Sequence, residues 1–134
     1  MPLLLDDDKD ALNERRILFV EDEAQRFIVL QSYKLPEGLY KQECCDVIVV
    51  IPNNYPQAGN DMFWTNPRLI RVDGKPIPQT NEPGGSDNRI FQGKEFCRWS
   101  RHWNQGSSVW QPGKDNIVTI LRRIEWAFRK PDTK

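Results

Sequence analysis

The segment CCDVIVVIP, residues 44–52, is the most apolar stretch of the chain and decides its fold class. A continuous apolar run of this length that ends at a proline is typical of a central strand of a sheet. Two further strand-like runs precede it, RRILFV (15–20) and RFIVLQSY (26–33), and the polar EDEAQ (21–25) between them predicts a hairpin. The pattern therefore predicts three neighbouring strands in chain order.

Helices are predicted at both ends of the chain. Residues 3–14 can form a short amphipathic helix. Near the C-terminus, apolar residues recur with helical spacing and form one stripe, namely Ile117, Ile120, Leu121, Ile124 and Phe128. Asp115 is suited to cap the start of this helix, and Pro131 is expected to close its end.

A long segment between these elements has neither helical nor strand periodicity. Residues 73–93 are rich in glycine, proline and asparagine, and a loop of this length in a compact domain is either disordered or functional. The order of elements is thus helix, strands, long loop and terminal helix. This order predicts an α+β domain with an antiparallel sheet.

The composition excludes several classes of protein. With 134 residues the chain is one domain, and 19 basic against 19 acidic residues leave no net charge to attract nucleic acid or an anionic membrane. One histidine, no C-x-x-C and no glycine-rich phosphate loop mean that neither a metal nor a cofactor is expected. Three cysteines and no export signal favour a cytoplasmic protein without disulfides.

The segment EFCRWSRHW, residues 95–103, concentrates the reactive side chains. It contains the only histidine, His102, together with Cys97 and Ser100, which would share one face of a helical turn. A serine needs a base to become a nucleophile, and His102 is the only histidine that could serve. Nearby cations would lower the pKa of a thiol and favour an oxyanion, namely Lys94, Arg98 and Arg101.

The same segment also has a purely structural interpretation. Trp99 and Trp103 can be anchors of the hydrophobic core, and Ser100 can be a local cap. Composition alone favours this interpretation over a nucleophilic site. The choice between the two depends on the surrounding sequence.

Motifs along the rest of the chain favour the functional interpretation of this segment. In chain order they are LPEGLY (35–40), IPNNYP (51–56), DMFW (61–64), RWSRH (98–102) and WQPGKD (110–115). They resemble the motifs of the bacterial ubiquitin-conjugating-like proteins of family E, with one residue inserted in the first motif. The resemblance spans roughly residues 16–128. Five motifs in the same order are a specific signal, whereas YP or WQP alone would be a weak one.

The resemblance implies the fold and the domain organisation. The implied fold is that of ubiquitin-conjugating enzymes, the UBC-like fold: α+β, with a four-stranded antiparallel meander sheet, a packed C-terminal helix and a long active-site loop. Residues 1–15 would be a short N-terminal segment, residues 16–130 the UBC-like domain and residues 131–134 a tail.

The resemblance also implies an activity and its partners. Such an enzyme accepts the C-terminus of a ubiquitin-like protein from an activating enzyme as an oxyester or thioester, and transfers it to an amine. Family members resemble components of bacterial conjugation operons that also encode a deconjugating peptidase, with anti-phage defence as the implied purpose. The activating enzyme is expected to dock on residues 1–14 and the first strands, where the acidic cluster Asp6–Asp8 would steer a basic partner.

The resemblance leaves two candidates for the residue that carries the acyl group. Ser100 lies ten residues before Trp110 and Cys97 lies thirteen before it, and the shorter spacing is closer to that of ordinary conjugating enzymes. Some bacterial relatives are thought to carry the modifier as an oxyester on serine. Ser100 is therefore preferred over Cys97.

Supporting roles follow from the same resemblance. His102 would protonate the departing serine oxygen, and Arg98 or Arg101 would stabilise the tetrahedral oxyanion. The eukaryotic His-Pro-Asn motif is absent, and SDN at 86–88 is a partial substitute in which Asn88 is a weaker oxyanion candidate. Asp61 is expected to fix a turn rather than to take part in chemistry.

Three other interpretations stay open at this point. A catalytically silent relative with the same fold would bind a ubiquitin-like protein or an activating enzyme as a scaffold. An unrelated Cys–His hydrolase is disfavoured because no orienting carboxylate lies at a recognisable spacing. A single-strand nucleic-acid binder would stack bases on Trp99 and Trp103, but the zero net charge weighs against it.

Overall fold

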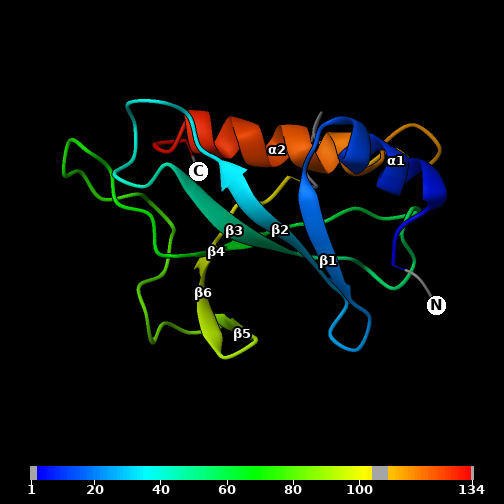
Figure 1. The fold of residues 1–134 in the computed structure, drawn as a ribbon, viewed down its shortest axis with the longest axis horizontal. Helices are drawn as coiled ribbons and strands as arrows, with labels where there is room; N and C mark the ends of the chain where they lie inside the picture. The colour runs from blue at the N-terminus through cyan, green and yellow to red at the C-terminus, as the bar shows by residue number, and fades with distance from the viewer. Residues whose placement is uncertain (1–2, 104–108, 134) are drawn as a thin grey trace.

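The computed structural model describes residues 3–103 and 109–133 and confirms the α+β class (Figure 1). Within these residues the elements are α1 (Asp6–Glu14), β1 (Leu18–Asp22), β2 (Phe27–Lys34), β3 (Cys44–Val50), β4 (Phe63–Asn66), β5 (Arg89–Phe91), β6 (Lys94–Trp99) and α2 (Ile117–Arg129). Helix α2 crosses one face of the curved sheet, and α1 lies near the start of α2 (Figure 1).

The strands form one antiparallel sheet in the order β1-β2-β3-β4-β6-β5. The adjacency of the first three strands confirms the predicted meander, but the expected number of four strands is wrong, since the sheet has six. One missed strand, β5, lies within the predicted loop 73–93 and has 3 residues, too few to establish a period of two. Gln92 and Gly93 join it to β6 with positive φ at both positions, the geometry of a tight two-residue hairpin.

Strand β3 is the central strand that its apolar sequence predicts. It pairs with β2 on one side and β4 on the other, and its middle is buried. Successive side chains of a strand point to opposite faces, so Val47 and Val49 join the main core with α2. Ile48 joins a smaller cluster with Trp64 and Phe96 on the other face. Because both faces are covered, the sequence of β3 is continuously apolar from Val47 to Val50 rather than alternating.

The predicted apolar stripe of α2 is buried, which fixes the helix on the sheet. Each fully buried Ile, Leu or Phe side chain contributes about 1.5–3 kcal/mol. The N-cap is Asn116, whose side chain accepts a 2.9 Å hydrogen bond from the backbone N–H of Val118, so the prediction of capping by Asp115 is wrong. Asp115 accepts bonds from the backbone N–H of Gln111 and the hydroxyl of Thr119, which tie the preceding turn to the helix.

The N-terminal helix is shorter than predicted and is anchored by a buried carboxylate. Asp8 is only 2% exposed. It accepts hydrogen bonds from the Tyr55 hydroxyl at 2.9 Å and from the backbone N–H of Ile117 at 3.2 Å, which joins α1 to the start of α2. Of the acidic cluster expected to steer a partner, only Asp6 and Asp7 are exposed, so the inclusion of Asp8 is wrong. Among the helices described, none is long and apolar enough to span a bilayer.

Candidate functional site

The segment EFCRWSRHW is extended rather than helical. Cys97 lies in β6, opposite Thr65 of β4, and Ser100 follows directly after the strand. The predicted helical turn with Cys97 and Ser100 on one face is therefore wrong. The reason is tertiary, because pairing with β4 places this segment in the sheet.

The two tryptophans of this segment are anchors of the main core. Trp99 and Trp103 both stack on Phe63, with ring centroids 5.1 and 6.0 Å away. Each indole is at least nine-tenths buried. This burial confirms the structural role of the tryptophans and leaves neither ring free as a stacking platform for nucleic-acid bases.

Cys97 lies in an environment that disfavours its thiolate. The side chain is buried, and burial raises the pKa of the Cys97 thiol, with a further contribution from the Glu95 carboxylate. The expectation that Lys94, Arg98 and Arg101 lower this pKa is wrong. Of the surrounding cations, Arg68 acts in that direction, and its effect is smaller than that of burial.

The two arginines of the segment are held by different partners. Arg98 lies 3.5 Å from the carboxylate of Asp87 and is partly exposed. Arg101 is only 1% exposed and donates hydrogen bonds to the carbonyls of Pro78 and Pro131, each at 3.0 Å. Burial lowers the pKa of the Arg101 guanidinium. These contacts make Arg101 a cross-link between a loop and the end of the chain.

Asn88 organises the loop that precedes β5. Its amide nitrogen donates to the carbonyl of Glu82 and to the carboxylate of Glu95, both at 3.0 Å. Its amide oxygen accepts from the backbone N–H of Arg98 at 3.1 Å. The nitrogen also lies 4.0 Å from the sulfur of Cys97. The structure thus brings Asn88 to Cys97 over β6, whereas Ser100 and His102 follow the end of that strand.

His102 has a carboxylate partner that lies far away in the sequence. Its Nδ1 is 2.8 Å from Oδ2 of Asp61, and the side chains are 50% and 45% exposed. A carboxylate only accepts hydrogen bonds, so this contact assigns a hydrogen to Nδ1 and leaves the lone pair of the neutral ring on Nε2. No described residue forms a hydrogen bond with Nε2. Asp61 therefore orients His102, a contact between distant residues that the sequence did not predict.

Ser100 lies two residues before His102 and is partly buried. Its backbone N–H donates a 2.8 Å hydrogen bond to the carbonyl of Gln79, which holds the chain as it leaves β6. In the described part of the chain no hydrogen bond to the Ser100 hydroxyl is present. The hydroxyl is thus not committed to a cap, the role suggested by the structural interpretation.

Contacts to Gly59 and Asn60 hold the loop that carries Asp61. The indole of Trp110 lies against Gly59, where a Cβ atom would be only about 2.0 Å from the ring, so no side chain fits there. The indole N–H of Trp110 also donates to the carbonyl of Pro56 at 2.8 Å. Arg123 of α2 donates to the carbonyl of Asn60 at 3.1 Å. Residues 59–61 are thus contacted in turn by Trp110, Arg123 and His102.

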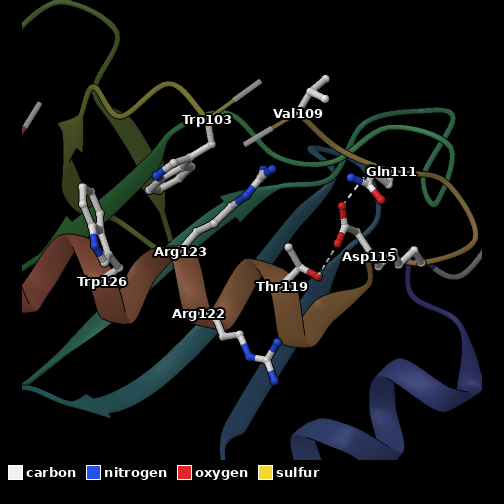
Figure 2. Close-up of a pocket in the computed structure, with 9 residues that line it drawn as sticks. Trp103, Val109, Gln111, Asp115, Thr119, Arg122, Arg123 and Trp126 are labelled. Carbon is white, nitrogen blue, oxygen red and sulfur yellow. Dashed lines mark hydrogen bonds between the residues drawn. The ribbon is translucent and has the colours of Figure 1, made fainter. Parts of the chain in front are cut away.

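A cavity of about 440 Å³ lies beside this site, between α2 and the chain that enters it (Figure 2). Trp103, the neighbour of His102, forms one wall, and α2 supplies Arg122, Arg123 and Trp126. Val109 and Trp126 are half-exposed on its rim. The remaining lining is polar, namely Gln111, Lys114, Asp115 and Thr119. The cavity therefore combines three apolar side chains, Trp103, Val109 and Trp126, with a polar lining in which cations outnumber the one carboxylate.

Sequence patterns missed Asp61, Trp110 and Arg123 as parts of the site. Asp61 and His102 are 41 residues apart, and no local spacing relates them. The available signal was that DMFW and RWSRH, which contain them, are both motifs of the resemblance. A group of three or more residues able to hold a metal ion is absent from the described residues.

Comparison with known proteins gives one match. The family model described as prokaryotic E2 family E matches residues 4–131. No curated protein and no solved structure was found to match the chain.

Proposed function

Because the chain belongs to prokaryotic E2 family E, we propose that it is a ubiquitin-conjugating-like acyl transferase. It accepts the C-terminal acyl group of a ubiquitin-like protein from an activating enzyme and passes it to an amine. The observation that carries this proposal beyond family membership is the contact between Asp61 and His102, beside a cavity. An imidazole oriented by a carboxylate, with its second nitrogen directed to solvent or substrate, is suited to proton transfer in acyl transfer.

In the proposed reaction Ser100 carries the acyl group. Nε2 of His102 takes the proton of the Ser100 hydroxyl as its oxygen attacks the thioester carbonyl on the activating enzyme. The carbon–sulfur bond breaks, the thiol leaves with a proton, and an oxyester remains. When the amine attacks the ester, His102 takes a proton from the amine nitrogen, the carbon–oxygen bond breaks, and His102 passes that proton to the departing serine oxygen. Asp61 keeps the ring oriented in both steps.

Cys97 is the second candidate acceptor and is less suited to the role. Its thiol is buried, and its raised pKa reduces the fraction of thiolate, which is the nucleophilic form. Of the proposed oxyanion donors, Arg98 is partly exposed and pairs with Asp87 at 3.5 Å. The Asn88 amide nitrogen and both terminal nitrogens of Arg101 already donate to protein oxygens, and Arg101 is buried. Arg98 is therefore the proposed oxyanion donor.

The cavity is the proposed place for the last residues of the modifier. Its apolar side chains, Trp103, Val109 and Trp126, fit those of an extended peptide, and Lys114 and Arg122 favour acidic groups or backbone carbonyls. Its position beside Trp103 brings such a peptide next to His102.

The proposed partners follow from the family. An activating enzyme docks on α1, where Asp6 and Asp7 are exposed, and a ubiquitin-like protein is the acyl donor. We place both in a bacterial cytoplasmic conjugation pathway with a deconjugating peptidase and a role in anti-phage defence.

The test is reconstitution of the transfer. With an activating enzyme, ATP and a ubiquitin-like protein, the chain acquires one modifier through a bond that resists thiol reductant and hydrolyses in alkali. Ser100→Ala abolishes this adduct and Cys97→Ala retains it. An adduct released by reductant and lost in Cys97→Ala would move the acceptor to Cys97. Binding of the ubiquitin-like protein without any adduct would identify a catalytically silent scaffold instead.

A further inference from the structure

Arg123 is a buried cation that neither lies in the reactive segment nor contacts His102 directly. It is 8% exposed and lies between two indoles, with its guanidinium 5.7 Å from the centroid of Trp103 and 5.5 Å from that of Trp110. Burial lowers the pKa of Arg123, and the carboxylates of Asp115 and Asp61 offset part of that effect. Burying a guanidinium costs free energy, so its position needs specific partners.

The partners of Arg123 lie in the loop that carries Asp61. Its Nη1 donates to the backbone carbonyl of Asn60 at 3.1 Å and lies 3.4 Å from the side-chain oxygen of the same residue. Asn60 is 1% exposed, so this bond is shielded from water. A charge-assisted hydrogen bond in such a place is stronger than one at the surface. Arg123 therefore fixes the main chain one residue before Asp61.

Other contacts complete the support of this loop. Trp110 packs against Gly59 on the side of the loop before Asn60, and the Arg123 guanidinium lies over Trp110. The position of Asp61 thus depends on α2 through Arg123. A displacement of about 1 Å of a group that orients a catalytic side chain is enough to reduce the rate roughly a hundredfold.

We propose that Arg123 is a positioning residue that holds Asp61 where it orients His102. This inference rests on the proposed function for its effect on transfer, but its structural part concerns the free protein. Arg123 touches neither reacting atom. It acts through the carbonyl of Asn60 and through the carboxylate of Asp61, next in the chain.

The structural part is tested by NMR of the single histidine. In two-bond ¹H–¹⁵N spectra of the free protein at a pH where the ring is neutral, wild-type His102 shows hydrogen on Nδ1. Arg123→Gln shifts the ring toward a mixture of the two tautomers, whereas Arg123→Lys, which keeps a charged donor, retains much of the Nδ1–H form. Arg129→Gln is the matched control, since this arginine of the same helix pairs with Glu125 and its spectrum stays that of the wild type.

The kinetic part is measured in the reconstituted transfer. Arg123→Gln lowers kcat roughly ten- to a hundredfold, by misplacing the base. Arg129→Gln leaves kcat unchanged. If α2 unfolds in Arg123→Gln, as judged by hydrogen exchange of its amides, Arg123→Lys is used instead, and its kcat should fall in proportion to its loss of the Nδ1–H form.

The positioning role and the proposed function can be rejected independently of each other. An unchanged His102 spectrum in a folded Arg123 variant would overturn the positioning role. A changed spectrum in a protein that performs no transfer would sustain the positioning role and reject the proposed function.

Discussion

The carboxylate of Asp61 lies 2.8 Å from Nδ1 of His102, which joins the start of β4 to the chain that leaves β6. Both side chains are about half exposed, so the pair is accessible to a macromolecular substrate. Even when the ring is protonated, an exposed pair of this kind contributes little to stability, in general less than about 1 kcal/mol. Stability therefore does not account for this contact, and we infer that it orients the imidazole.

The first prediction concerns this pair. His102→Ala and Asp61→Asn should each slow transfer of the modifier on the order of a hundredfold, the usual effect of losing or misorienting a general acid or base. The rates are measured by single-turnover discharge to an amine. Asp22→Asn, in the exposed β1–β2 hairpin, is the control and should react at the wild-type rate. A wild-type rate in His102→Ala would limit this histidine to a structural role.

The second prediction concerns the buried thiols. Burial raises the pKa of Cys45 and of Cys97, so both thiols ionise at higher pH in the folded protein than in the unfolded chain, where a thiol ionises near pH 8.5. The folded state then binds more protons, and the free energy of unfolding should fall as pH rises, by up to about 1.4 kcal/mol per pH unit for each thiol. Urea titrations at pH 8 and 10 measure this slope.

The control for the thiols is Cys44, which is exposed. Cys45→Ala should flatten the alkaline slope, and Cys44→Ala should leave it as it is. An equal slope in wild type and Cys45→Ala would show that other groups, such as the buried tyrosines, dominate at high pH.

The third prediction concerns the anchor of α1. Asp8→Ala leaves the Tyr55 hydroxyl and the backbone N–H of Ile117 without their acceptor, and each unsatisfied buried group costs about 1–3 kcal/mol. Unfolding in urea should show a loss of roughly 2–4 kcal/mol. The exposed neighbour gives the matched control, since Asp7→Ala should change stability by less than about 0.5 kcal/mol.

The fourth prediction concerns the contact of Gly59 with Trp110. A methyl group at position 59 would overlap the indole, so Gly59→Ala should destabilise the protein by roughly 1–3 kcal/mol and reduce transfer. In a double-mutant cycle, the cost of Gly59→Ala should be smaller when Trp110 is replaced by leucine, because the clash is then relieved. Strictly additive costs would show that the loop avoids the indole in solution.

The fifth prediction concerns docking of the activating enzyme. Reversal of Asp6 and Asp7 to lysine should slow association with it, mainly at low ionic strength, because steering by exposed charges is screened by salt. Stopped-flow association rates at several salt concentrations provide the measurement. Glu37→Lys, on an exposed loop away from α1, is the control. Association that is insensitive to the reversal would place the docking surface elsewhere.

The parts of the fold that depend on local pattern could be predicted from the sequence. The stripe of α2 and the apolar run of β3 are periodic over enough residues to identify the element and its buried face. Strand β5 escaped prediction because its three residues form a strand only by pairing with β6. Pairing with β4 likewise makes the segment around Cys97 a strand, although the spacing of its reactive side chains predicted a helical turn.

The candidate site could be predicted only in part. His102 and Ser100 were identified because unusual residues gather in one segment, whereas Asp61 contacts His102 only after the chain has folded back over 41 positions. The effect of nearby charges on the pKa of the Cys97 thiol was mispredicted for a related reason, because neighbours in sequence do not determine the environment of a buried group. Arg98 and Arg101 are neighbours of Cys97 in sequence, but burial, not their charge, dominates at the thiol.

The contacts on residues 59–61 have a consequence for how the protein matures during synthesis. The partners of this loop, His102, Trp110 and Arg123, all come from the last third of the chain. Strands β1 to β4 all precede these residues in the chain and therefore leave the ribosome first. A chain at that stage cannot yet hold Asp61 against an imidazole. The capacity for the proposed proton transfer therefore arises only after α2 has been synthesised, and chains that stop before Arg123 should lack it.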